Sequence, residues 1–207
     1  MLTVNQYINS HKFIVAPLVI LMMWFFNNWS GTAFVYLSMH GTYAYLWLIK
    51  QKVYPDRRFS QPVPAWIGVC FIFLPLFAYF LAPFLLLRSG RAASPALAAC
   101  AIACFTLGIF LHYVSDAQKY YTMLYRKGLI EEGLFSRTRN PNYLGEILIY
   151  ASFACLAQNV LPFIILGCWV VYFFHNMRKK DASLARHPGF QQYKRRTGML
   201  LPSLRRR

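Results

Sequence analysis

The sequence predicts an all-α membrane protein, a polytopic bundle of about six transmembrane helices whose last two form a hairpin. Of its 207 residues, 57% are hydrophobic and only 14% are charged. A soluble domain would carry charge on about a quarter of its residues. Apolar blocks also recur at about the 20-residue length that spans a bilayer. We therefore expect residues 1–207 to form a single integral membrane domain, with the lipid bilayer as its partner.

The first four expected spans cover residues 13–29, 32–49, 64–87 and 93–114. No small-residue cleavage site follows the first block, so we expect it to stay in the protein as a span rather than be removed as a signal peptide. A basic, proline-broken loop at 50–58 separates the second span from the third, which is the most uniformly hydrophobic block. The fourth is rich in small residues, which suit close packing of helices in a membrane.

The longest non-apolar region, residues 115–142, follows the fourth span. It starts as a helical extension and breaks at Gly128. The last two apolar runs, 144–157 and 160–174, are separated by only two polar residues. This arrangement predicts a helical hairpin with a short first arm, and a basic tail follows it.

The basic residues indicate the orientation of the bundle. The formal net charge is +16, but Lys and Arg lie between and after the apolar blocks, so we expect no nucleic-acid partner. If both termini lie on one side, every Lys and Arg except Arg88 and Arg91 falls on that side. The positive-inside rule then makes both termini cytoplasmic. The cysteines lie inside apolar blocks with no metal-ligand spacing, so no metal is expected.

The polar segment 133–142, which we call the elbow, contains two arginines, two asparagines and a proline directly before an apolar run. Glu146 lies inside that run, and a carboxylate at the mouth of a membrane helix is costly enough to be a functional candidate. Pro141 biases Asn140 away from helical geometry. We therefore expect the next helix to begin near Asn142, whose side chain would cap it.

The elbow has the chemistry of a site for an anionic, ribose-bearing cofactor. The N-terminus of a helix offers N–H groups to an anion, and the guanidinium groups of Arg137 and Arg139 match phosphate or carboxylate. Tyr143 offers a ring face and a hydroxyl, and Glu146 could accept hydrogen bonds from a ribose. A structural role is the alternative, because arginines before a membrane helix also anchor it to lipid headgroups and Glu146 could pair with one of them.

Two further pairs of residues are candidates. His112 and Asp116 are spaced to share one face at the end of the fourth span. His40 and Tyr43 lie in the middle of the second span, where they could form a proton-donor pair. Packing is the alternative for both pairs.

Residues 112–202 resemble the C-terminal domain of the steroid 5-alpha-reductase family. The matching segments are Ser115-Asp116, Arg126-Lys127-Gly128, Gly133-Leu134-Phe135, Asn142-Tyr143-Leu144-Gly145-Glu146, and Tyr193 with Leu201-Pro202. Sterol reductases and isoprenylcysteine carboxyl methyltransferases share the broader fold. Their Arg-His-Pro-x-Tyr-x-Gly elbow is similar to residues 139–145 here.

The resemblance implies that NADPH binds from the cytoplasmic side to residues matching Asp116, Arg126, Asn142 and Glu146. Residues 112–207 would then be the cofactor-binding half, and residues 1–111 would meet the substrate. In the steroid enzymes, a Glu and a Tyr in the early spans address the carbonyl of the enone. No Asp or Glu precedes residue 56 here, so His40 and Tyr43 are the expected catalytic residues.

The sequence thus predicts an NADPH-dependent reductase of a carbon–carbon double bond in a lipid-soluble, steroid- or isoprenoid-like substrate. An alternative is an S-adenosylmethionine-dependent methyltransferase acting on a membrane-bound lipid or prenylated substrate. The methyltransferases use an acidic pair in the tail, which is met here only by Lys180-Asp181. A second alternative is a membrane lipid-binding protein without catalytic activity.

Overall fold

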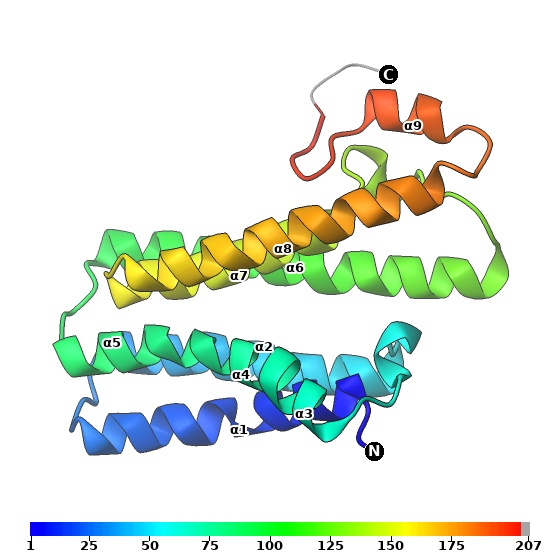
Figure 1. The fold of residues 1–207 in the computed structure, drawn as a ribbon. Coiled ribbons are helices and arrows are strands. Elements are labelled where there is room, and N and C mark those ends of the chain that lie inside the picture. Colours follow the sequence, from blue (N-terminus) through cyan, green and yellow to red (C-terminus); the bar gives the residue numbers. More distant parts are fainter. Residues whose placement is uncertain (204–207) are drawn as a thin grey trace. The chain divides into compact units, whose positions relative to one another are not determined.

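The computed structural model describes residues 1–203, and most of them are helical (Figure 1). The described chain has no strand, only isolated bridges from Thr3 to Pro62 and from Thr138 to Gly198. Within it, the helices long and apolar enough to cross a membrane are α1 (Val4–Phe25), the continuous stretch Ala65–Ser89, α6 (Pro95–Tyr125) and α8 (Leu161–Leu184). The predicted all-α membrane fold is therefore confirmed, and the chain is an integral membrane protein.

The other two expected spans are also helices, but one is less apolar and the other is shorter than the four candidate spans. α2 (Gly31–Val53) contains 23 residues, but its polar side chains and two C-terminal lysines make it less apolar than the four candidate spans. α7 (Pro141–Ala157) has 17 residues, which is short for a membrane crossing that needs about 20. Among the described residues, four helices therefore meet the requirements of a span, and the expected number of about six stays a prediction.

The chain divides into two compact units. The first contains residues 1–103 and 151–165, and the second contains residues 104–150 and the chain from Leu166 onward. The boundary in α6 lies close to the expected division between residues 111 and 112, but the first unit also includes the end of α7 and the start of α8.

In the first unit, α1 packs along α2, and the stretch Ala65–Ser89 packs against α1. That stretch is not a uniform α-helix: α3 (Ala65–Ile67), the π-helical turn η2 (Gly68–Phe73), α4 (Leu74–Phe77), the 3₁₀ turn η3 (Ala78–Phe80) and α5 (Leu81–Ser89) follow one another. Pro75 lies at this irregular region, and proline removes a backbone hydrogen bond and clashes with the preceding turn. Val15, Ala44 and Phe80 form one buried apolar cluster of the unit.

α1 begins earlier than expected, at Val4 rather than near residue 13. A capping box starts the helix: the Gln6 N–H donates to Thr3 Oγ1 at 3.3 Å, and the Thr3 N–H donates to Gln6 Oε1 at 2.8 Å. As a result, Lys12 lies inside a helix rather than in an N-terminal loop.

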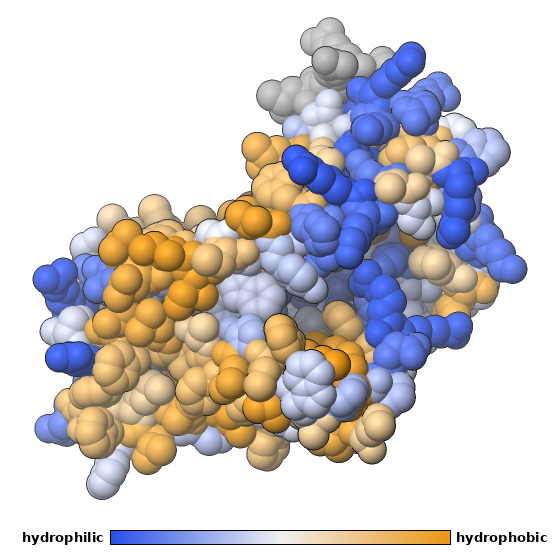
Figure 2. Space-filling view, viewed as in Figure 1, coloured by the Kyte–Doolittle hydropathy of each residue, from blue (hydrophilic) through white to orange (hydrophobic). Residues whose placement is uncertain are grey.

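In the second unit, α6, α7 and α8 are accompanied by the 3₁₀ turn η4 (Gly133–Ser136) in the elbow and by α9 (Phe190–Arg196) in the tail. α6 continues from the apolar block to Tyr125, which confirms the predicted helical extension. Hydrophilic side chains gather over α9 and the adjoining end of α8 (Figure 2). The polar end of this unit is therefore the end that contains the elbow and the tail.

α6 and α7 approach each other until their backbones touch. A Cβ atom added to Gly145 would lie 2.5 Å from the His112 backbone nitrogen and 2.6 Å from the Gly108 carbonyl oxygen. A Cβ atom added to Gly108 would in turn lie 2.7 Å from the Gly145 oxygen. Small residues at this crossing allow the close contact, as is common between membrane helices.

Gly145→Ala should therefore destabilise the protein. Because the added methyl group meets rigid backbone on α6, we expect a loss of about 1–3 kcal/mol, measured by thermal unfolding in detergent. The matched control is Gly167→Ala on α8, where an added Cβ meets nothing within 4 Å. Alanine should stabilise that helix by up to about 1 kcal/mol. Equal melting temperatures for the two variants would contradict the backbone contact.

Candidate functional site

An ion pair between Arg139 and Asp181 joins the elbow to the end of α8. Arg139 Nη2 lies 2.9 Å from Asp181 Oδ2, and Arg139 Nε lies 3.1 Å from Asp181 Oδ1. The two side chains are only 4% and 8% exposed. Arg139 Nη1 donates to the Thr197 carbonyl oxygen at 2.8 Å. Both ends of the guanidinium group are thus bound by the protein itself.

The neighbouring elbow residues are also bound to the tail and to α8. Lys180 Nζ donates to the Arg139 carbonyl at 2.7 Å and to Asn140 Oδ1 at 3.0 Å. Asn140 Nδ2 donates to the Met199 carbonyl at 2.8 Å, and Thr138 Oγ1 donates to the Leu200 carbonyl at 2.8 Å. The elbow is therefore a fixed platform in front of α7. We call this set of contacts, with the Arg139–Asp181 pair, the clasp.

Tyr193 on α9 adds a further contact to the same region. Its hydroxyl donates to the Phe135 carbonyl oxygen at 2.9 Å, and its side chain is buried. Burial raises the pKa of the Tyr193 phenol above its usual value, so the group keeps its proton and remains a donor. This bond fixes α9 to the turn η4 that opens the elbow.

Two expectations for the elbow are corrected by this geometry. Arg139 was expected to bind a cofactor, but its guanidinium group is buried and bound within the clasp. Asn142 was expected to cap α7, but the helix already begins at Pro141, so Asn142 is inside its first turn. Proline suits the first helical position because its missing N–H would have no partner there and its φ is already helical.

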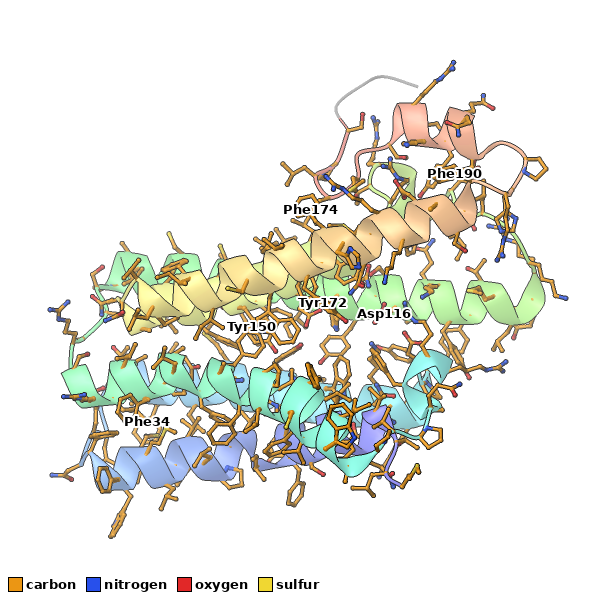
Figure 3. The ribbon with its side chains drawn as sticks, in the orientation of Figure 1. Phe34, Asp116, Tyr150, Tyr172, Phe174 and Phe190 are labelled. Carbon is orange, nitrogen blue, oxygen red and sulfur yellow. The ribbon has the colours of Figure 1, made fainter. Side chains whose placement is uncertain are left out.

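The α6–α7 contact brings four expected residues onto two touching helices. His112 Nδ1 lies 3.2 Å from the Asn142 carbonyl oxygen. Asp116 lies one turn beyond His112 on α6 (Figure 3), and Glu146 lies one turn beyond Asn142 on α7. Asp116, Asn142 and Glu146 are partly exposed. Tyr143, the next residue of α7, packs its ring against Phe173 of α8 at 4.9 Å.

The two remaining expected arginines are exposed. Arg126 follows the end of α6 and forms an ion pair with Glu132. Desolvation raises the pKa of Glu132, but the hydrogen bonds that it accepts from Arg126 and from backbone N–H groups outweigh this effect and hold the pKa below its usual value. Arg137 lies on the surface of the elbow, with its Nη1 atom 3.5 Å from the Ser203 carbonyl oxygen. Both guanidinium groups remain accessible to a soluble anion.

A cavity of about 380 Å³ lies beside the clasp in the second unit, and no motif in the sequence predicted it. Its lining residues come from the end of α8, from α9 and from the chain next to them: Arg178, Asp181, Ala182, Ala185, Phe190, Gln191, Lys194 and Met199. The spacing of Arg178 with Asp181, and of Gln191 with Lys194, places each pair on one helix face, which is the only signal in the sequence for this cavity.

The two expected catalytic residues lie in the first unit, on α2. His40 is fully buried, and its Nδ1 lies 3.1 Å from the Tyr36 hydroxyl. The expected pairing of His40 with Tyr43 is therefore replaced by a pairing with Tyr36, one turn earlier. Tyr43 instead lies beneath a cation that no sequence pattern predicted: Lys12 Nζ is 4.1 Å from the centre of the Tyr43 ring. Among residues 1–203, no three His, Cys, Asp or Glu side chains form a group that could hold a metal ion.

The fold defines a helical integral membrane protein, and the polar residues at the α6–α7 contact define a candidate polar site where these two helices touch. Residues 42–197 match the family described as a protein of unknown function, DUF1295, and the chain belongs to that family. The family is part of the steroid 5-alpha-reductase-like superfamily, which confirms the resemblance at the level of the superfamily. No curated protein matches the chain. The matched region includes the elbow but leaves out α1 and the first part of α2.

The clasp can be tested by removing one side of its ion pair. Arg139→Gln should lower the free energy of unfolding by about 3–5 kcal/mol, because it leaves the Asp181 carboxylate buried without its charged partner. Arg137→Gln, the same change at an exposed neighbour, should stay within about 0.5 kcal/mol of the unaltered protein. Both are measured by denaturant unfolding in detergent. If the two variants were equally stable, the clasp would not hold the elbow.

Proposed function

We propose that this chain is a membrane-embedded reductase that uses NADPH to reduce a carbon–carbon double bond in a lipid-soluble, steroid- or isoprenoid-like substrate. The observation that carries the proposal is the α6–α7 contact. Two glycines bring the helices into backbone contact, and Asp116, Asn142 and Glu146 are presented on them within a chain that has few acidic residues. Membership of the steroid 5-alpha-reductase-like superfamily supports the same activity.

The residues of the second unit fit NADPH by chemistry. Asp116 and Glu146 offer carboxylates to ribose hydroxyls or to the amide of the nicotinamide, and Asn142 and Tyr143 add neutral hydrogen-bonding groups. The first turn of α7 offers backbone N–H groups to a phosphate. Exposed Arg126 and Arg137 supply positive charge near the elbow.

In the proposed function Arg139 does not contact the cofactor. It has a structural role, because its ion pair with Asp181 holds the elbow in place. NADPH, when bound, supplies the hydride. His40 and Tyr43 remain the proposed catalytic residues, as groups that hold or move a proton at the substrate. The charge distribution favours a cytoplasmic location for the termini and the elbow, where NADPH is dissolved.

The clasp favours the reductase over the methyltransferase alternative. The position of the methyltransferases' acidic pair holds Lys180 and Asp181 here. Lys180 donates to the Arg139 carbonyl and to Asn140 Oδ1, while Asp181 binds the Arg139 guanidinium group. Both side chains are thus used to hold the elbow. These two residues of α8 therefore have a structural role here, whereas the methyltransferase hypothesis would assign them to S-adenosylmethionine binding.

Glu146→Gln should weaken NADPH binding by about 10- to 100-fold, because a carboxylate that accepts hydrogen bonds is replaced by a neutral amide of the same shape. Asp116→Asn should have an effect in the same direction. Binding is measured by isothermal titration of the purified protein in detergent.

Asp56→Asn is the matched control, since Asp56 lies in the first unit and binds Arg58 of its own loop. Its affinity for NADPH should be unchanged. A parallel titration with S-adenosylmethionine tests the alternative enzyme class. Unchanged NADPH affinity in Glu146→Gln would overturn the site, and binding of S-adenosylmethionine instead of NADPH would overturn the reductase. Binding of neither nucleotide would favour a lipid-binding protein without catalytic activity.

A further inference from the structure

The cavity beside the clasp lies between the end of α8 and α9, and it shares no residue with the proposed NADPH site. Arg178, Asp181 and Ala182 are spaced to lie on one face of α8, which forms the first wall. Gln191 and Lys194 lie on one face of α9 and belong to the second wall. The volume of about 380 Å³ is in the range of sites that hold small molecules.

The cavity has an excess of positive charge. Arg178 lines it from α8 and Lys194 from α9, and neither side chain forms an ion pair with a described residue. The acidic residue among the described lining residues, Asp181, is already paired with Arg139 in the clasp. The two cations are therefore available to an anion that enters the cavity. Gln191 adds an uncharged hydrogen-bonding group beside them.

The clasp holds the two walls of the cavity in place. Arg139 binds the Asp181 carboxylate on α8, and its Nη1 atom donates to the Lys194 carbonyl oxygen at 3.4 Å. The same nitrogen donates to the Thr197 carbonyl oxygen at 2.8 Å, directly after α9. One buried guanidinium group thus ties both walls together, so the cavity is formed before a ligand enters. A preformed site loses less free energy on binding than one that must first be ordered.

The rest of the lining is apolar. It consists of Ala182, Ala185, Phe190 and Met199. The alanines contribute only methyl groups, which leaves space beside α8, and Phe190 is 2% exposed. A ligand with both an anionic group and an apolar part therefore fits this lining better than an inorganic anion does.

The position of the cavity along α8 indicates where such a ligand comes from. α8 is a candidate membrane span, and its apolar run ends at Phe174. Arg178 follows four residues later, which is about 6 Å further along an α-helix. The polar layer on each side of the hydrocarbon core is about 5–7 Å thick. Arg178 is therefore expected at the depth of the lipid head groups.

The composition of the same region favours acidic lipids. Residues 178–196 contain seven Lys or Arg residues and a single Asp. Hydrophilic side chains cover this end of α8 and α9 (Figure 2). Basic segments next to a membrane span attract anionic lipids, and basic pockets at that level bind their head groups.

We propose that this cavity binds the phosphate-bearing head group of an anionic phospholipid, with Arg178 and Lys194 as its charge partners. The apolar lining residues contact the glycerol and the adjoining part of the acyl chains. The proposal goes beyond the proposed reductase, because binding of a lipid here requires neither NADPH nor turnover.

Native mass spectrometry of the purified full-length protein in detergent tests this binding. The protein is titrated with dioleoyl phosphatidylglycerol, which is anionic, or with dioleoyl phosphatidylcholine, which has the same chains but a zwitterionic head group. We expect the first phosphatidylglycerol to bind at a concentration about 10-fold lower, because the choline cation is repelled by Arg178 and Lys194. Equal half-saturation by the two lipids would overturn the proposal.

Charge variants separate the cavity from the basic tail as a whole. Arg178→Gln should reduce the preference for phosphatidylglycerol to less than about 3-fold, since one of the two charge partners is lost. Arg186→Gln removes the same charge from an exposed residue outside the lining and should leave the preference unchanged. Equal effects of these two changes would attribute the preference to the overall charge of the tail, and the cavity would be rejected.

A second pair of variants tests the space rather than the charge. Ala182→Leu fills the cavity and should weaken binding of phosphatidylglycerol by about 10-fold. Ser183→Leu, at the next exposed residue but outside the lining, should leave binding unchanged. Unchanged binding in Ala182→Leu would show that the lipid does not enter the cavity. The comparison of the two lipids on the unaltered protein decides the question even if a variant does not fold.

Soluble phosphate compounds are the remaining alternative occupants. Neither glycerophosphoglycerol, which is the head group without acyl chains, nor NADPH should displace bound phosphatidylglycerol at about a 10-fold molar excess, because both lack the apolar chains. Displacement by either compound would assign the cavity to a soluble phosphate ester or to the cofactor, and would overturn the lipid proposal. A protein that prefers phosphatidylglycerol but does not bind NADPH would retain this site and lose the proposed reductase activity.

Discussion

The ion pair between Arg139 and Asp181 connects three parts of the second unit that are distant in the sequence. Taking both charges out of water costs several kcal/mol per ion, and the pair is stable only because additional hydrogen bonds satisfy the guanidinium group. The Thr197 carbonyl supplies one of these bonds. The elbow, the end of α8 and the chain after α9 consequently depend on one another, and none of these segments can move without exposing a buried charge.

The backbone contact between α6 and α7 holds the apolar part of the same unit in place. Gly108 and Gly145 allow the helices to touch, and His112 then lies 3.2 Å from the first turn of α7, measured to the Asn142 carbonyl. The clasp fixes the position at which α7 begins, and the two glycines determine how α7 packs against α6. Together they determine the positions of Asp116 and Glu146, although neither residue belongs to the clasp or to the glycine contact. Rigid support of this kind is what a precisely arranged functional site requires.

Local patterns in the sequence predicted the parts of the structure that depend on local physics. Apolar blocks of membrane length predicted the helices, and the polar continuation of the fourth block predicted that α6 extends to Tyr125. Long-range pairing could not be predicted in the same way. Nothing in the spacing of the residues links Arg139 to Asp181, 42 positions later, so the guanidinium group was expected to bind a ligand.

Other differences have local causes that could have been recognised. The Thr3–Gln6 capping box is visible in the sequence, and it moves the start of α1 back to Val4 and brings Lys12 into the helix. Tyr36 lies four residues before His40, a spacing as suitable for contact as that of Tyr43. The cofactor, the substrate and the catalytic roles of His40 and Tyr43 stay predictions, since they depend on ligands rather than on folding.

The position of Lys12 also has a consequence for the way the chain enters the membrane. A lysine near the centre of a single helix costs about 2.5–3.5 kcal/mol when the translocation machinery releases that helix into lipid. Lys12 lies in the middle part of α1, but the rings of Tyr43 and Trp47 on α2 cover its ammonium group. α1 is thus better suited to insert as a hairpin with α2 than alone, with integration of the first helix delayed until the second has been synthesised.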